Sequence, residues 1–421
     1  MEHTVKEITL KNGAKGLLIK SPKSPVTNIY TAFNAGFLFG DTAKFELPHV
    51  VEHMMFTNKK YPDRNQFSAE FEKNGAYVNA HTDDDKIAYD YECAAFETDR
   101  ILELATLQLT QPIFPADELT TEVGNVEEEL SEALSDHSRL CGEALAAMCG
   151  QPSLSERIAQ LGSITRDDLL KFYKKTHTLK NAHFIVGGNI DEAAIESKLN
   201  SMLSSLPKGK CLKVEGSLYR HLPEPIVVSR DIQQIYYYFM SVVPRQFTFR
   251  ELTAARLIDR ILTDGFSSRI FGKIREEGLA YGIHSRVESG IQESTYYIGG
   301  FVSKKNQNRL FQIVTEEINN ALGGNLTQKE LDKAKLKAKG SFARNYQTIY
   351  DIVKWYRSYT LFNEIESFSS YPQLIDKITL KEATKAFTEV INQNCWGLSF
   401  VGNINKTGAE KVHSQLQNIW Q

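Results

Sequence analysis

The sequence predicts an α+β protein made of two tandem, homologous α/β-sandwich domains. Two observations lead to this fold class. Short stretches of alternating apolar and polar residues are separated by longer stretches whose apolar residues recur at helical spacing, so strands and amphipathic helices are mixed along the chain. In addition, segments of the first half of the 421 residues recur in the second half, which indicates an internal repeat.

The repeat sets the expected domain boundaries. Three pairs of similar positions lie 214, 212 and 205 residues apart, in this order: Gly188 with Gly402, Glu118 with Glu330, and Glu46 with Glu251. Proline, glycine and lysine are frequent in residues 207–222, as is typical of a junction. We therefore expect domains at 1–206 and 223–421, joined by a linker at 207–222.

Two β-hairpins are predicted in the first half. Residues 7–19 have extended character around a central Asn-Gly pair, which favours a tight hairpin turn. In residues 75–91 a glycine is followed by a stretch of extended character, and Ile87, Tyr89 and Tyr91 then alternate with polar neighbours. An exposed edge of this second hairpin is suited to accept a peptide as an added strand.

The segment between the hairpins contains the most informative motif of the chain. His49, Glu52 and His53 occur within five residues, in the order H-x-x-E-H. On a helix, residues four apart lie on the same face, so both imidazoles can reach one ion while Glu52 stands beside it. The alternative is a pair of surface histidines that share an amphipathic helix by chance.

A hydrolytic metal site needs a third protein ligand and one open position. Residues 118–134 form a carboxylate-rich stretch whose apolar residues recur at helical spacing. Glu122 and Glu129 are seven residues apart and therefore share a face of the expected helix. Most acidic residues on such a helix are simply solvated, and spacing by itself does not choose the ligand.

Composition excludes several classes of protein. A net charge of −3 predicts neither a nucleic-acid nor an anionic-membrane partner, and no stretch reaches the apolar length of a membrane span. Residues 1–7 lack the apolar region of a signal peptide. The five cysteines are scattered and form no C-x-x-C pair, so we expect reduced thiols and a cytoplasmic location.

The H-x-x-E-H motif, followed 76 residues after His53 by Glu129, resembles the inverzincin peptidases of the pitrilysin/insulinase type, which include the mitochondrial processing peptidase. The resemblance implies a Zn²⁺ ion bound by His49, His53 and Glu129. It implies that Glu52 is the general base and that Glu122 supports the site.

The hairpin strand also resembles a family feature. Asn79-Ala80-His81-Thr82 is similar to the family's Asn-Ala-x-Thr strand, whose edge pairs with extended substrate, so Asn79 and Ala80 are the expected substrate-binding residues. Tyr89 occupies the position of the family's strand tyrosine. His81 is expected to be an ordinary strand histidine, because three ligands are already available.

The second half cannot bind the metal in the same way. At the offset of 205 residues the motif positions are occupied by apolar residues: Ala254, Leu257 and Ile258. This half instead contains Arg275 and Tyr281, which resemble the family's substrate-contacting arginine and tyrosine, so both are expected to act in catalysis by steadying the substrate or the developing oxyanion. The two are six residues apart, whereas the usual family spacing is seven, so Arg269 remains an alternative for the arginine role.

These features predict a zinc-dependent endopeptidase that hydrolyses unfolded peptides or presequences in a closed chamber. The resemblance implies that two such domains form half of a clamshell, which is completed in a homodimer or in a heterodimer with a related subunit. Two alternatives stay open: a catalytically silent assembly subunit of the same fold, and a zinc hydrolase of a non-peptide substrate.

Overall fold

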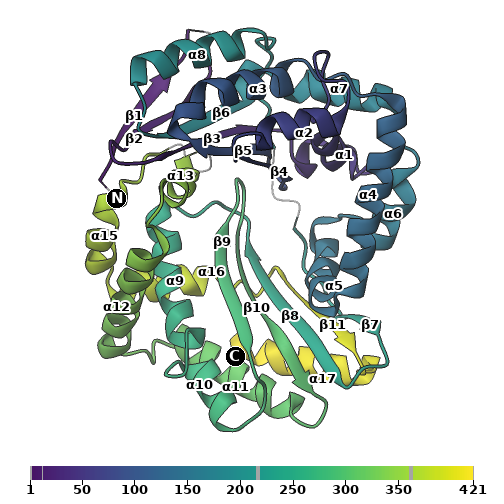
Figure 1. Ribbon diagram of the computed structural model, residues 1–421. Helices are drawn as coiled ribbons and strands as arrows, with labels where there is room; N and C mark the ends of the chain where they lie inside the picture. Colours follow the sequence, from purple (N-terminus) through teal and green to yellow (C-terminus); the bar gives the residue numbers. More distant parts are fainter. Residues whose placement is uncertain (1, 12, 215–218, 360–363, 421) are drawn as a thin grey trace. The chain divides into compact units, whose positions relative to one another are not determined.

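The computed structural model describes residues 2–11, 13–214, 219–359 and 364–420. Contacts between residues divide the chain into two compact units (Figure 1). Unit 1 contains Met1–Leu130, Glu156–Val214 and Asn345–Ile365, and unit 2 contains Ser131–Ser155, Glu215–Arg344 and Glu366–Gln421. Each unit holds one β-sheet and a set of helices, which confirms the predicted α+β class.

Unit 1 is built on a six-stranded sheet with the order β1-β2-β6-β3-β5-β4. Neighbouring strands are antiparallel except for β2 and β6, which are parallel. The strands are β1 (Thr4–Thr9), β2 (Lys15–Lys20), β3 (Val26–Phe33), β4 (Tyr77–Thr82), β5 (Ile87–Ala94) and β6 (Ala182–Gly188). Among the described strands β4 pairs with β5 alone, so it lies at the edge of the sheet.

Both predicted hairpins are present. Strands β1 and β2 pair along their whole length, and Gly13 in the connection has φ +92, a left-handed conformation that favours glycine. Asn12, the other residue of the predicted turn, lies outside the described residues. Strands β4 and β5 pair from Tyr77 with Glu92 to Thr82 with Ile87.

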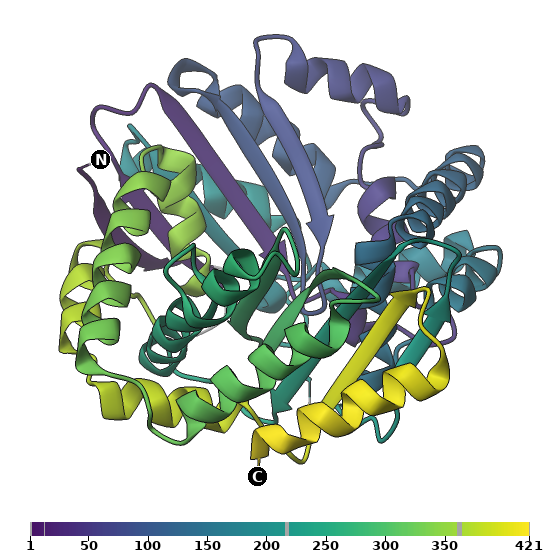
Figure 2. The same ribbon diagram turned by 90° about the horizontal axis from the view of Figure 1, so that it is seen from below.

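Helices cover both faces of this sheet. They are α1 (Leu47–Met54), α2 (Arg64–Glu72), α3 (Thr98–Thr110), α4 (Ala116–Ser135), α6 (Leu154–Leu161), α7 (Arg166–Thr176), α8 (Glu192–Ser204) and α13 (Ile349–Tyr356). Helices α1, α2 and α3 contact β4 and β5. Helix α13, from the second half of the chain, packs on β3 and β6 (Figures 1 and 2).

Side chains explain how α13 is held. Gly187 in β6 leaves room for the helix, because a Cβ atom there would lie 2.6 Å from Cγ2 of Val353. Just after the helix, the Arg357 guanidinium lies 4.3 Å from the centre of the Tyr30 ring and forms an ion pair with Asp90.

Unit 2 repeats this plan. Its sheet has the order β7-β11-β8-β10-β9, and β7 and β11 are its parallel pair. The strands are β7 (Ile226–Ser229), β8 (Gln234–Val243), β9 (Ile283–Ser289), β10 (Ser294–Ser303) and β11 (Trp396–Gly402). This order matches that of β2, β6, β3, β5 and β4, so these five strands have the same topology in both units, and β1 is an additional strand at the edge of the unit 1 sheet.

Helices of unit 2 pack on its sheet, as helices of unit 1 do on theirs. They are α5 (His137–Ala144), α9 (Phe249–Thr263), α10 (Arg269–Glu276), α11 (Gln307–Leu322), α12 (Gln328–Asn345), α15 (Tyr371–Lys377), α16 (Leu380–Val390) and α17 (Lys406–Leu416). Helices α9, α11 and α16 contact strands of the sheet, and α5, from the first half of the chain, packs on β8 and β11. Each half therefore contributes one helix to the other half's sheet.

Because of this exchange, the two contact units differ from the two continuous domains that the sequence predicts. The segments that change units, 131–155 and 345–365, lie inside the predicted domains 1–206 and 223–421, so the contact units are discontinuous in sequence. The described ends of the expected linker are bonded to the units. Leu212 N donates to Asn181 Oδ1 over 2.7 Å in unit 1, and Leu222 N donates to Trp396 O over 3.0 Å in unit 2. Residues 215–218 of the linker lie outside the described residues.

We expect Gly187→Val to destabilise unit 1, because the new side chain occupies the space of Val353. Overpacking of this kind costs about 1–3 kcal/mol. The free energy of unfolding can be measured by urea denaturation followed by circular dichroism. As a control of opposite sign, Gly124→Ala on α4 places a methyl group in open space and should stabilise by up to about 1 kcal/mol. Equal stability of parent and Gly187→Val would contradict the packing of α13 on β6.

Candidate metal centre

Helix α1 positions the H-x-x-E-H motif. Pro48 stands in its first turn, where the lack of an amide hydrogen costs nothing. Val50, Val51 and Met54 are fully buried and fix the helix in unit 1. The other side of α1 presents His49 and His53, whose rings lie 4.8 Å apart between centroids. The expected helix and the shared face of the two histidines are confirmed.

Helix α4 brings Glu129 to these histidines. Its Oε2 lies 3.4 Å from Nε2 of His49, and its Oε1 lies 3.6 Å from Nε2 of His53. One ligand atom from each of the three residues lies within 4.8 Å of the others. Within the described part of the chain this is the one such group of three or more potential ligands. Glu128 and Glu132, the acidic neighbours on α4, are not in it.

A buried carboxylate accepts a hydrogen bond from the Nδ1 atom of each histidine, on the side of the ring away from Glu129. Glu46, fully buried, accepts a hydrogen bond from Nδ1 of His49 at 2.9 Å and a second from Nε of Arg157 at 2.5 Å. Glu122, 2% exposed, accepts from Nδ1 of His53 at 2.9 Å and is paired with Arg64. The Nε2 atoms of both rings are thereby left to face Glu129.

The carboxylates are charged despite their burial. Burial by itself would raise the pKa of Glu122, yet the hydrogen bond with His53 and the charge of Arg64 hold it below its usual value. The pKa of Glu46 is likewise lowered, because His49 and Arg157 outweigh the effect of burial. Two buried, paired carboxylates therefore fix both imidazole rings in orientation.

The donor set fits a zinc ion. Zn²⁺ prefers imidazole nitrogen and carboxylate oxygen ligands, and a hydrolytic site has three of them and an open position. Ligating histidines commonly donate their second ring N–H to a carboxylate, as His49 and His53 do here. The Glu129 side chain is 52% exposed, so solvent reaches the point where the three side chains meet.

Glu52 connects the motif helix to the edge strand. It is 8% exposed, and its Oε2 accepts a hydrogen bond of 2.8 Å from the Thr82 hydroxyl at the end of β4. Ala80 shares a face of β4 with Thr82, and Asn79 is on the opposite face. The expected base therefore lies beside the strand that carries the expected substrate-binding residues.

The structure also places two further residues of this region that the sequence singled out. Tyr89 is fully buried, and its hydroxyl lies 3.0 Å from Nε2 of His177, so it belongs to the core of unit 1. His81 is absent from the three-residue ligand group, and its Nε2 lies 3.8 Å from Asp83.

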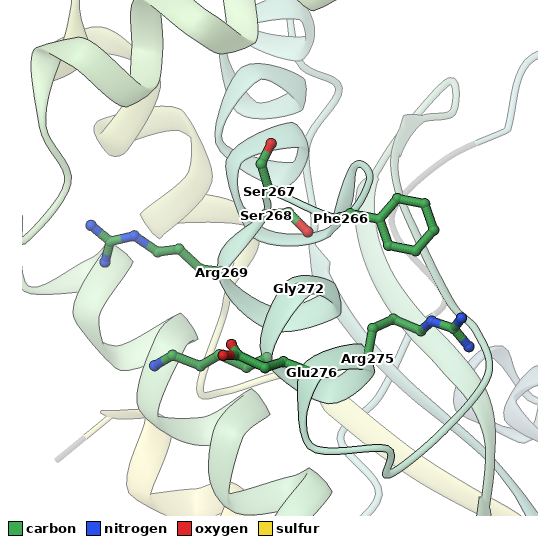
Figure 3. A pocket seen from close by; sticks show the side chains of 8 residues that line it. Phe266, Ser267, Ser268, Arg269, Gly272, Arg275 and Glu276 are labelled. Atoms are coloured by element: carbon green, nitrogen blue, oxygen red, sulfur yellow. The ribbon is translucent and has the colours of Figure 1, made fainter.

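Arg275 and Tyr281 lie together in unit 2. The Arg275 guanidinium is 4.7 Å from the centre of the Tyr281 ring and 5.8 Å from that of Phe266. Both rings are largely exposed, at 78% and 75%. Figure 3 shows Arg269 leaving α10 on the other side from Arg275, and Arg269 is paired with Glu330. Arg275 is therefore the arginine that contacts Tyr281, despite the spacing of six residues.

Four residues of the site were not predicted from the sequence. Thr82 was noted only as part of the strand, and the carboxylate of Glu46 and the guanidinium groups of Arg64 and Arg157 were not singled out. The position of Glu46, three residues before His49, is the one local signal that could have revealed its contact. The arginines come from α2 and α6, and no spacing rule links them to the motif.

Sequence comparison identifies the family. Residues 17–160 match the model described as "Insulinase (Peptidase family M16)", and residues 163–337 match the model described as "Peptidase M16 inactive domain". The two matches together cover most of the chain. The chain therefore belongs to the M16 family of peptidases, as the resemblance predicted.

The curated relatives carry different names. A Rickettsia felis protein named "Uncharacterized zinc protease" is 23% identical over 369 residues, which cover 86% of this chain and 87% of that protein. In Helicobacter pylori, a protein named "Non-peptidase homolog YmxG" is 24% identical, with 87% of each chain covered. "Zinc protease PqqE" of the same organism is 21% identical, with 91% and 89% covered.

Solved structures share the fold. A peptidase M16 inactive domain from Pseudomonas fluorescens has a TM-score of 0.84 at 19% identity, with 96% of this chain and 98% of that chain covered. Pitrilysin has a TM-score of 0.78 at 14% identity, and all of this chain covers 49% of the pitrilysin chain. At these identities the likeness establishes the fold.

The pH dependence of metal binding follows from the state of His49. Burial lowers its pKa, but the hydrogen bonds to Glu129 and Glu46 outweigh burial and raise the pKa to about 9 in the metal-free protein. His49 is therefore protonated at neutral pH, and an incoming metal must displace this proton. We expect the apparent Kd for zinc to fall by about tenfold per pH unit from pH 6 to 8, measured by competition with a chelator. An affinity independent of pH in this range would contradict the assignment of His49.

Proposed function

We propose that this protein is a zinc-dependent endopeptidase. The observation that carries the proposal is the convergence of His49, His53 and Glu129 on one point, with Glu52 hydrogen-bonded to the end of edge strand β4. A peptide added to β4 would bring its backbone to these groups whatever its side chains.

In the proposed hydrolysis of a peptide bond, residues of this chain bind the metal, transfer the proton and contact the substrate. A zinc ion bound by the three ligands would polarise the scissile carbonyl and lower the pKa of water toward about 7. Glu52 takes a proton from the attacking water and delivers it to the leaving amine. The Thr82 hydroxyl orients the carboxylate of Glu52. Arg275 and Tyr281 act as substrate-contacting groups of unit 2, where the Tyr281 ring is largely exposed and therefore accessible.

The assembly is part of the same proposal. Pitrilysin is about twice as long as the part of it that this chain covers. A second subunit, either a copy of this chain or a related one, would complete a clamshell of which this chain is one half. The substrates are unfolded peptides or presequences, which alone can enter a closed chamber and form a strand along β4.

The proposed location is cytoplasmic. None of the five cysteines is joined in a disulfide, as expected of a protein kept in a reducing compartment. Among the helices that the structure describes, none has the length and apolar character needed to span a bilayer.

Two alternatives differ in what the metal site does. One relative is named a non-peptidase homolog, which favours a silent assembly subunit as the second candidate. The complete ligand set with its two supporting carboxylates argues for catalysis, since a silent subunit has no need of it. A zinc hydrolase of a non-peptide substrate would use the same metal site but not the edge strand β4.

Glu52→Gln should abolish most turnover and leave zinc content and fold unchanged. The amide keeps the shape and the contact with Thr82 but cannot take the proton, and a general base contributes about 10²–10⁴ in rate. Cleavage of an internally quenched peptide, with and without chelator, measures the effect. Full activity of the zinc-loaded variant would contradict the mechanism. Absence of any chelator-sensitive cleavage by the parent would favour the silent subunit.

Glu129→Gln should weaken zinc retention far more than Glu128→Gln, which changes a neighbouring carboxylate outside the ligand group. Glu46→Gln should have an intermediate effect, a loss of about 10–100-fold in zinc affinity, because it acts through the orientation of His49. Zinc retention by the three variants is ranked by measuring their zinc content after dialysis against increasing concentrations of a chelator. Equal retention by the Glu129 and Glu128 variants would rule out Glu129 as a ligand.

A further inference from the structure

Unit 1 contains a hollow that the proposed chemistry does not use. It has a volume of about 500 Å³ and lies where the first turn of α13 meets strands β3, β4 and β5. Its walls are mainly apolar and aromatic, and they include one carboxylate. The lining residues that matter here are Val26, Tyr77, Glu92, Ile349 and Tyr350.

The carboxylate of Glu92 is the unusual group in this hollow. It is partly buried, and within the described part of the chain it accepts no hydrogen bond and forms no ion pair. Its charged neighbours, Asp351 and Asp90, are themselves acids, and each already has its own partner: Asp351 accepts from Thr348 at the start of α13, and Asp90 is paired with Arg357. Burial raises the pKa of Glu92, and these two acids raise it further.

A cation bound in the hollow would stabilise the negative charge of Glu92. A partly desolvated carboxylate among other acids is stabilised by an opposite charge, and an exposed aromatic ring binds the stem or the face of a cationic side chain. Tyr77 supplies such a ring. It is 60% exposed and lies directly opposite Glu92 in the register of β4 and β5, so both side chains are on the same face of the sheet. The walls and the charge together fit arginine or lysine.

The hollow lies along the proposed path of the substrate. Tyr77 begins β4, and Thr82, which contacts Glu52, ends it. Five residues of strand span about 17 Å. A peptide paired with the free edge of β4 would therefore pass Tyr77 about five residues away from the bond that is cut.

The distance between neighbouring strands determines which side chains of a bound peptide are long enough to reach Glu92. A peptide strand outside β4 would be two strand positions from β5, a distance of about 9–10 Å. Short side chains on that peptide cannot approach Glu92. Arginine and lysine are long enough to extend across the Tyr77 ring toward the carboxylate, with the aliphatic stem on the ring.

We propose that this hollow is a substrate subsite that accepts an arginine or lysine side chain about five residues from the scissile bond. Tyr77 carries the aliphatic stem, and Glu92 pairs with the cationic head. The subsite rests on the proposed peptidase function and adds a preference for basic peptides, at a position remote from the metal.

The test uses one neutral, internally quenched peptide of fourteen residues in which a single arginine replaces glutamine at each position in turn. The zinc-loaded protein should show the highest kcat/KM when arginine is about five residues from the cleaved bond, on one side of it only. We expect a preference for arginine over glutamine there of about tenfold, which corresponds to about 1.4 kcal/mol. Mass spectrometry verifies that the cleaved bond is the same in every peptide.

Three variants test whether the preference for arginine over glutamine arises at this hollow. Glu92→Gln should reduce the ratio of arginine to glutamine to near one, with the kcat/KM of the glutamine peptide unchanged, and Tyr77→Ser should reduce the ratio in part. Glu103→Gln changes an exposed carboxylate on α3 and should leave the ratio at its parental value. A ratio that survives Glu92→Gln, or a faster reaction with phenylalanine than with arginine at this position, would overturn the subsite.

A binding measurement separates this inference from the peptidase proposal. If the parent cleaves none of the peptides, the peptidase proposal fails, and the affinities of fluorescent arginine and glutamine peptides are compared by anisotropy. Tighter binding of the arginine peptide, lost in Glu92→Gln, would support a basic-peptide site without catalysis. Equal affinities would overturn the subsite as well. Cleavage without any positional preference would overturn the subsite alone.

Discussion

The hydrogen bonds between two histidines and two buried carboxylates are the interactions on which the candidate site depends. A buried carboxylate is costly unless it is paired. Here Glu46 is balanced by Arg157 and Glu122 by Arg64, so the charges are satisfied and the rings of His49 and His53 are held with Nε2 toward Glu129. Four helices, α1, α2, α4 and α6, contribute to this arrangement. The candidate metal site is therefore a property of unit 1 as a packed structure and not of the motif alone.

The exchange of α5 and α13 gives each sheet a helix from the other half of the chain. In unit 1 the exchanged helix does more than cover β3 and β6. Arg357, which follows it, neutralises Asp90, and its first turn forms one wall of the hollow at Glu92. A segment far along the sequence from the motif thus shapes the proposed path of the substrate. The described residues of the second half contain no group of potential metal ligands, yet this half supplies α13 to the sheet of unit 1. Unit 1 is incomplete without it, which gives a physical reason for the second half to be retained.

The edge strand β4 joins the two proposals about substrate. One end of it carries Thr82 beside Glu52, where the chemistry is proposed, and the other carries Tyr77 beside Glu92. Main-chain pairing along such an edge provides affinity without selecting a sequence. Side-chain pockets at fixed points along the strand are then the means of selection. The spacing of the strand, and not a flexible element, sets the distance between cleavage and recognition.

Local spacing in the sequence determined a large part of this protein. The H-x-x-E-H order placed two imidazoles and a carboxylate on one helical face, the repeat at 205–214 residues implied two tandem homologous domains, and alternation predicted the β4–β5 hairpin, because helical and strand periods are local properties. Only the tertiary structure decided the partners of Glu46, the choice of Arg275 over Arg269 beside Tyr281, and the exchange of α5 and α13. These depend on contacts between residues far apart in the chain, and such contacts are set by packing and by the pairing of buried charge, which have no period in the sequence.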